Sequence, residues 1–139
     1  MDNFEVFEGN ENIPVILSCE HASKHIPEEL NNLGVSMEEL SKCNFLCDKG
    51  VEKAYESLVN GLGCKGIKAK VSRLVIDVNR DVDQENLIRT TCGHHSFSVN
   101  QELTKEERED RINKYYLPYR NKLHDLLIEC EKKHGVCFY

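Results

Sequence analysis

"PVILSCEHASKHIP", residues 14–27, is the stretch that decides how the rest of this 139-residue chain is interpreted. The apolar run Val15–Cys19 is short and begins with a β-branched residue, which is typical of a buried strand. It ends at a carboxylate and an imidazole, Glu20 and His21, and a second imidazole, His25, follows four residues later. Because ligands bind beyond the carboxyl ends of strands in open α/β sheets, these side chains form a candidate site.

Composition and charge are those of an ordinary globular chain. Charged residues make up 30% and hydrophobic residues 40%, and the formal net charge is −6. The length corresponds to one domain, and the acidic balance argues against a broad basic surface for nucleic acid. No apolar stretch approaches the roughly 20 residues of a membrane span, and the acidic beginning MDNFEVFEGNEN does not resemble a signal peptide. We therefore expect a cytoplasmic protein that binds neither nucleic acid nor membranes.

Seven cysteines are scattered along the chain. An odd number without a secretion signal argues against a disulfide framework, so most thiols are expected to be reduced and several to be buried. Cys43 and Cys47 have C-x3-C spacing, but a structural zinc site needs four ligands and no matching second pair is present.

Helix and strand signals alternate along the chain. Capping boxes at Ser36/Glu39 and Thr104/Glu107 predict two helix starts. Asp48 is expected to be the N-cap of a further helix, and Pro118 to kink or split the long helix that follows Thr104. Apolar patterns predict strands at 15–19, 67–71, 74–78 and 136–139.

The remaining segments complete the expected organisation. Residues 1–13 are a polar lead-in, residues 14–139 are expected to be the domain, and the polar stretch 81–103 is expected to be an irregular loop. Strands that alternate with helices in this way indicate an α/β fold with a mostly parallel sheet.

A second polar cluster lies in SRLVIDVNR, residues 72–80. On the expected strand, Arg73 and Asp77 share one face, and an arginine fork can hold a carboxylate with two hydrogen bonds. A structural Asp–Arg pair is the alternative. The spacing also resembles the beginning of a calcium loop, but the Gly and Glu that such a loop needs are Val82 and Ile88, which excludes calcium here.

The histidines allow several interpretations from spacing alone. His21 and His25 have the i, i+4 spacing of helical zinc motifs, but Pro27 disfavours a helix through them. His21 by itself is either a metal ligand at the end of the strand or a loop histidine that hydrogen-bonds the backbone. The adjacent His94 and His95 have diverging side chains, so we expect a solvated loop there.

Three stretches together resemble the N-formylglutamate amidohydrolase family. They are PVILSCEHASKHIP, VSRLVIDVNR (71–80) and INKYYLPYRNKLHDLL (112–127), with CDKGVEKA between the first two. Their order and spacing also fit that family, and the resemblance covers residues 14–139. The first two stretches are more specific than the third.

This resemblance implies a zinc-exopeptidase-like α/β fold, a three-layer sandwich, and metal-dependent hydrolysis of an N-acyl amino acid such as N-formylglutamate. Zn²⁺ is the implied cofactor and an acidic small molecule the implied partner, with a homo-oligomer possible. The implied roles are metal ligation by His21 and Asp48, and either metal ligation or catalysis as a base by Glu20. Substrate binding is implied for Arg73 and Arg80, with support from Asp77 and Asn79. Such a metal would lower the pKa of bound water to about 7, and arginine forks suit a dianion.

The resemblance also implies a third metal ligand, the histidine of an "HS" motif that family members carry beyond the last strand matched here. We therefore expect a chain truncated at its C-terminus relative to the family. Three alternatives stay open: a fragment or truncation without activity, a minimal enzyme, and a binding module for an acidic small molecule. The minimal enzyme would recruit His94 or His95, or would complete its site across a homodimer.

Overall fold

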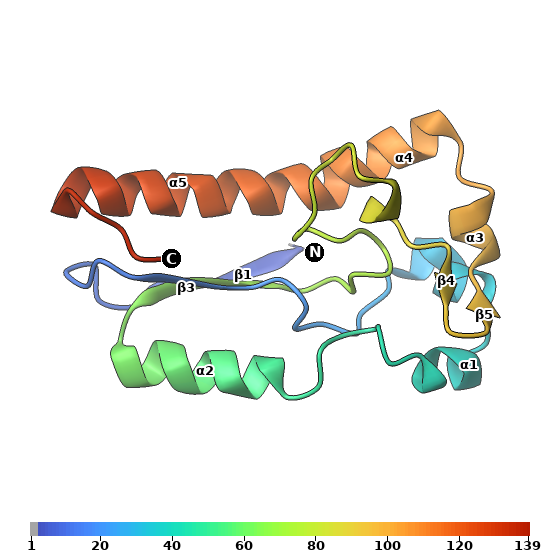
Figure 1. The fold of residues 1–139 in the computed structure, drawn as a ribbon, viewed down its shortest axis with the longest axis horizontal. Helices are drawn as coiled ribbons and strands as arrows, with labels where there is room; N and C mark the ends of the chain where they lie inside the picture. Colours follow the sequence, from blue (N-terminus) through green and yellow to red (C-terminus); the bar gives the residue numbers. More distant parts are fainter. Residues whose placement is uncertain (1–2) are drawn as a thin grey trace.

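The computed structural model of the protein describes residues 3–139 and has an α/β architecture (Figure 1). Its main sheet has three strands in the order β1-β3-β2. β2 (Ile16–Cys19) runs parallel to β3 (Lys65–Ala69), whereas β1 (Phe4–Phe7) is antiparallel to β3. The α/β class is confirmed, but the sheet is mixed rather than mostly parallel.

Helices cover both faces of this sheet (Figure 1). On one face, Tyr119 and Leu123 of the long helix pack with Ile16 and Ile67 of the strands, whereas on the other Tyr55 packs near Cys19. No helix within residues 3–139 is long and apolar enough to cross a membrane. The helices are η1 (Glu28–Gly34), α1 (Met37–Lys42), α2 (Val51–Leu62), η2 (Glu85–Leu87), α3 (Ser98–Gln101), α4 (Lys105–Arg111), η3 (Ile112–Tyr116) and α5 (Leu117–His134).

Strand β1 was not predicted from the sequence. It lies inside the expected polar lead-in, whose first two residues are outside the described part of the chain. Phe4 and Val6 alternate with polar residues and pack against the core, which is the two-residue period of a half-buried strand. That alternation is short and lies among acidic residues, so the composition of the segment did not indicate a strand.

Both predicted capping boxes are confirmed: the side chains of Ser36 and Thr104 accept the backbone N–H of Glu39 and Glu107. The prediction of Asp48 as an N-cap is wrong. Gly50 is the N-cap of α2, with a φ of +81° that suits glycine. The Asp48 carboxylate is therefore not used at the helix end.

Residues 74–78 do not form the predicted strand. They are buried, but they follow a series of turns. Side chains from α3 and α4 bind their carbonyl groups: Asn100 Nδ2 donates to the Leu74 carbonyl at 2.9 Å, and Arg111 Nη1 donates to the Val75 carbonyl at 3.1 Å. Buried backbone groups need partners, and here side chains take the place of a neighbouring strand.

The long helix changes its pitch before Pro118. A π-helical turn, η3, connects α4 to α5, and the Leu117 N–H donates to the Ile112 carbonyl five residues earlier. Pro118 falls in the first turn of α5, where a missing N–H costs little. The predicted break therefore exists, but it is a wide turn just before the proline.

The segment 81–103 is more ordered than predicted. It contains η2, α3 and a hairpin of β4 (Thr91–Cys92) and β5 (His95–Ser96), and Phe97 is fully buried. Cys92 forms a disulfide with Cys43, 49 residues away, which is a single pair and not the disulfide framework that the sequence argued against. Five cysteines are free, four of them buried.

The C-terminal segment pairs with the sheet as predicted but is not buried. Phe138 forms an isolated parallel bridge with Val15, and its backbone exchanges hydrogen bonds with Pro14 and Ile16. The Phe138 side chain is 61% exposed, because this single bridge lies at the sheet's edge.

Candidate functional site

His21 follows β2 directly and lies between two carboxylates. Its Nε2 donates to Asp77 Oδ1 at 2.7 Å, and its Nδ1 lies 3.3 Å from Asp48 Oδ2. Asp48 comes from the turn before α2 and is 52% exposed at its side chain, whereas Asp77 comes from the buried turns after β3 and is 1% exposed. Two segments far apart in sequence thus fix both sides of one imidazole.

Asp77 is the buried anion of the site. Besides His21, it accepts the backbone N–H of Asn79 at 3.1 Å. Two guanidinium groups approach its second oxygen, with Arg73 Nη2 at 3.6 Å and Arg80 Nε at 3.3 Å. A buried carboxylate requires such compensation, because isolated charge is costly away from water.

His21 and Asp77 form an ion pair in which each partner favours the charged form of the other. Burial alone would lower the pKa of His21, but the hydrogen bond and charge of Asp77 outweigh it and raise that pKa above its usual value. Burial likewise opposes ionisation of Asp77, and the hydrogen bond and charge of His21 hold the pKa of Asp77 below its usual value.

The contact with Asp77 also determines which nitrogen of His21 faces the surface. In the neutral ring, a proton on Nε2 that binds the carboxylate leaves the lone pair on Nδ1. Nδ1 faces Asp48, and Arg73 Nη1 lies 3.2 Å from Nδ1 and 3.0 Å from Asp48 Oδ1. The imidazole thus presents an acceptor beside a carboxylate, and a guanidinium bridges the two.

The Glu20 side chain contacts different residues from those around His21. Its Oε1 accepts the hydroxyl of Tyr119 at 3.3 Å and that of Tyr139 at 3.4 Å. Tyr119 is fully buried on α5, so burial foremost raises its pKa and the hydroxyl stays protonated as a donor. The structure therefore does not place the Glu20 carboxylate in the cluster of His21, Asp48 and Asp77.

Helix α5 and the π turn hold the segment 77–80 against this cluster. The Tyr116 hydroxyl donates to the Arg80 carbonyl at 2.7 Å, and Arg120 Nη1 reaches the Val78 carbonyl at 3.5 Å. The three sequence stretches singled out above, 14–27, 71–80 and 112–127, therefore meet at one place in the fold.

A family model described as N-formylglutamate amidohydrolase matches residues 13–139, which is nearly the whole chain. The chain belongs to the N-formylglutamate amidohydrolase family. The resemblance seen in the three stretches is thereby confirmed. No curated protein matches the chain at a significant level.

Solved structures of similar fold include two bacterial proteins. The crystal structure of gene product Atu2144 from Agrobacterium tumefaciens superposes with a TM-score of 0.87 at 25% identity, over 99% of this chain and 54% of the other. An N-formylglutamate amidohydrolase from Ralstonia eutropha JMP134 superposes with a TM-score of 0.80 at 22% identity, over 99% and 55%. The chain thus spans about half the length of the solved structures it matches.

The donors of the site suit a zinc ion in kind. Zinc takes imidazole and carboxylate ligands, and a ligating histidine usually donates its other N–H to a carboxylate, as His21 does to Asp77. In number they fall short of the three protein ligands usual for catalytic zinc: no group of three or more His, Cys, Asp or Glu within residues 3–139 is placed to hold a metal. His95 lies 4.0 Å from Glu39 on α1, so the structure does not bring it to His21.

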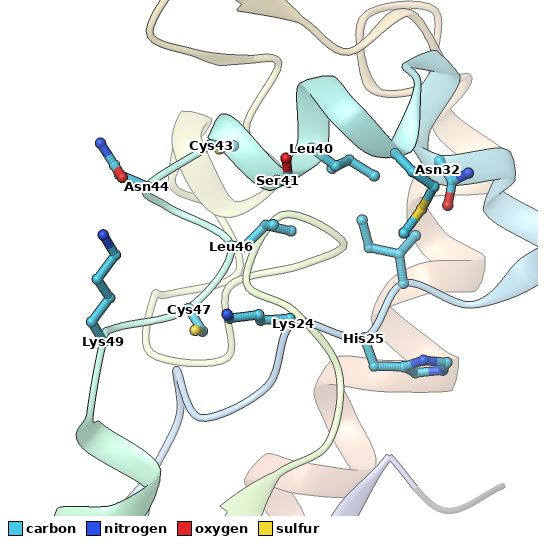
Figure 2. Close-up of a pocket in the computed structure, with 12 residues that line it drawn as sticks. Lys24, His25, Asn32, Leu40, Ser41, Cys43, Asn44, Leu46, Cys47 and Lys49 are labelled. Carbon is cyan, nitrogen blue, oxygen red and sulfur yellow. The ribbon is translucent and has the colours of Figure 1, made fainter.

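Two pockets lie beside Asp48 and share Lys24, the exposed His25, Cys47 and Lys49. One, of about 420 Å³, is bordered by α1 and by Lys24 and Cys47 (Figure 2). The other, of about 790 Å³, includes Asp48 and several lysines. Residues 21–26 are not helical, so the i, i+4 pair of His21 and His25 is not on one helix face.

Several residues around the site were not singled out from the sequence. Phe45, Arg89 and Asn100 lie in segments that carried no recognisable motif, and Tyr139 is the last residue. The sequence stretch 112–127, which contains Tyr119, resembled the family but did not indicate that this hydroxyl binds Glu20.

Proposed function

We propose that this chain carries the metal-dependent amidohydrolase chemistry of its family and hydrolyses an N-acyl amino acid such as N-formylglutamate to formate and the amino acid. The observation that supports this most directly is the orientation of His21. A buried carboxylate holds one ring nitrogen, and the other faces Asp48, which is the arrangement of a histidine ready to bind a metal.

Three of these residues have separate roles in the proposed metal site. His21 and Asp48 would hold Zn²⁺, and Asp77 would orient the His21 ring. A bound zinc ion supplies Lewis acidity and a water of lowered pKa. Arg73 lies between the two metal-binding side chains, so its guanidinium has to move when a metal binds.

Arg80 and Arg73 would bind the carboxylates of an acidic substrate, and Asn79 supports Asp77 through its backbone N–H. Glu20 is the proposed proton carrier. Its present hydrogen bonds are to tyrosines, so in that role it would have to turn from the α5 side toward the bound amide.

Zinc content tests the proposal. Protein that has been stripped with a chelator and dialysed against zinc is expected to retain about one zinc per chain, measured by elemental analysis. His21→Ala is expected to lose it, whereas the exposed His124→Ala is the matched control and should keep it. Equal zinc in all three proteins, or none in the wild type, would contradict metal binding at His21.

Formate release from N-formylglutamate then tests turnover. Glu20→Gln should retain zinc yet slow this release by about 100-fold or more, because it removes the proton carrier and not a ligand. Zinc-loaded wild type that releases no formate would leave metal binding intact and refute hydrolysis.

Arg80→Ala is expected to weaken the binding of a dicarboxylate by about 1.5–3 kcal/mol, the value of a charge-assisted hydrogen bond. Isothermal titration calorimetry with glutarate measures this change. Arg108→Ala is the control, since Arg108 binds the Val82 carbonyl on an exposed surface. An affinity equal to that of the wild type would remove Arg80 from the site.

A binding module for an acidic small molecule is the second candidate. It is favoured by the bridge that Arg73 makes between His21 and Asp48, which already compensates both groups without a metal. A protein that stays free of zinc after dialysis, and whose thermal stability a chelator leaves unchanged, would support this alternative.

A further inference from the structure

Arg89 differs from the other five arginines of the chain. The guanidinium groups of the others have hydrogen bonds or ion pairs with carboxylates, amides or backbone carbonyls, whereas that of Arg89 has neither with any residue of 3–139. The Arg89 side chain is nevertheless half-buried, and its Nε is buried without a hydrogen-bond partner, as are the Nε atoms of Arg73 and Arg80. The two Nη groups are not buried in this way, so they can bind an acceptor that residues 3–139 do not supply.

Arg89 lies beside the candidate site through Phe45. The Arg89 Cζ is 5.0 Å from the centre of the Phe45 ring, and the Arg73 Cζ is 5.8 Å from the same centre. Both distances are within the range of cation–π contacts. One partly exposed ring therefore holds two guanidinium groups, of which one, Arg73, already binds Asp48 and contacts His21.

The backbone also fixes Arg89 relative to Arg73. Asn100 Nδ2 donates to the Arg89 carbonyl at 2.6 Å and to the Leu74 carbonyl, next to Arg73, at 2.9 Å. Arg111 Nη1 in turn donates to Asn100 Oδ1 at 2.7 Å. Asn100 and Arg111 are both buried, so this connection is rigid and holds the two arginine-bearing segments together.

We propose that Arg89 is a specificity-determining residue that takes over the side-chain carboxylate of an acidic N-acyl amino acid, which leaves the α-carboxylate to Arg73 and Arg80. The inference rests on the proposed function for the identity of the substrate. Asp77 already compensates much of the charge of Arg73 and Arg80, whereas Arg89 has no carboxylate partner within residues 3–139 and shares the Phe45 ring with Arg73. A second carboxylate supplies the missing acceptor.

Two ligands distinguish carboxylate binding by Arg89 from non-specific electrostatic attraction. Glutarate carries two carboxylates, and glutaramate is an isosteric analogue in which one carboxylate is an amide. The wild type is expected to bind glutarate about tenfold or more tightly than glutaramate, in calorimetric titrations of the full chain. Arg89→Ala should lose this preference by weakening glutarate alone, and Arg89→Lys should recover only part of it because lysine lacks the planar fork.

Arg108→Ala serves as the matched control, and circular dichroism establishes that each variant is folded. Arg89→Ala with the wild-type preference for glutarate overturns the proposal, as does a wild type that binds the two probes equally or binds neither. The titrations need neither zinc nor turnover. A failure of zinc binding or formate release would therefore refute the proposed hydrolysis without affecting this result.

Discussion

Asp77→Ala is expected to lower the free energy of unfolding by about 3–5 kcal/mol, which is the cost of removing one member of a buried ionic network. Asp77 is nearly inaccessible and compensates three cationic or polar partners, namely His21, Arg73 and Arg80. Without it, the Arg73 guanidinium remains largely buried with only Asp48 as a counter-ion, and the His21 Nε2–H has no acceptor.

Urea denaturation monitored by circular dichroism measures this loss. Asp125→Ala is the control, since Asp125 is exposed on α5 and a surface change of this kind stays within about 0.5 kcal/mol. A midpoint for Asp77→Ala equal to that of the control would mean that the arginines and His21 are satisfied without Asp77, and would refute the network described here.

Asn100→Ala is expected to lower the free energy of unfolding by a similar amount. The Asn100 amide donates to two backbone carbonyls, and its oxygen accepts a hydrogen bond from Arg111. Each buried group left without a partner costs about 1–3 kcal/mol, so the total is several kcal/mol. The loss should also loosen residues 74–78, which have no neighbouring strand to replace the missing donor. Hydrogen exchange of that segment is expected to accelerate.

Asn113→Ala provides the comparison for Asn100→Ala. Asn113 is exposed on η3 and no side-chain hydrogen bond of it is seen within residues 3–139, so its replacement should leave stability and exchange nearly unchanged. If Asn100→Ala exchanges amide protons at 74–78 as slowly as this control, the side-chain anchoring of that segment is refuted.

The sequence predicted best those features that depend on neighbouring residues. The capping boxes at Ser36 and Thr104 and the strand before Glu20 are local patterns, and all three are confirmed. The run 74–78 shows the limit of such patterns. A buried apolar segment looks like a strand whether its carbonyls bind another strand or side chains such as Asn100, and only the folded chain distinguishes the two.

The sequence predicted that several of the candidate side chains lie together, but not all of their contacts. Family resemblance placed His21, Asp48, Arg73, Asp77 and Arg80 together, and they do meet. That Asp77 and not Glu20 binds His21 depends on side-chain direction, which adjacent positions in a sequence do not reveal. The disulfide Cys43–Cys92 and the stacking on Phe45 join segments more than 25 residues apart, beyond the reach of any spacing rule.

The π turn at Ile112–Tyr116 bears on how this chain should be aligned with its relatives. In this turn an N–H donates to the carbonyl five residues earlier instead of four. The helix can therefore contain one additional residue here without rotating the segments before and after it. A relative that lacks this residue would carry a one-residue gap here and still present its counterpart of Tyr119 to the sheet. Loss of one residue within the regular part of α5 would instead rotate the helix beyond it by about 100°, which would direct Leu123 and Leu126 to solvent.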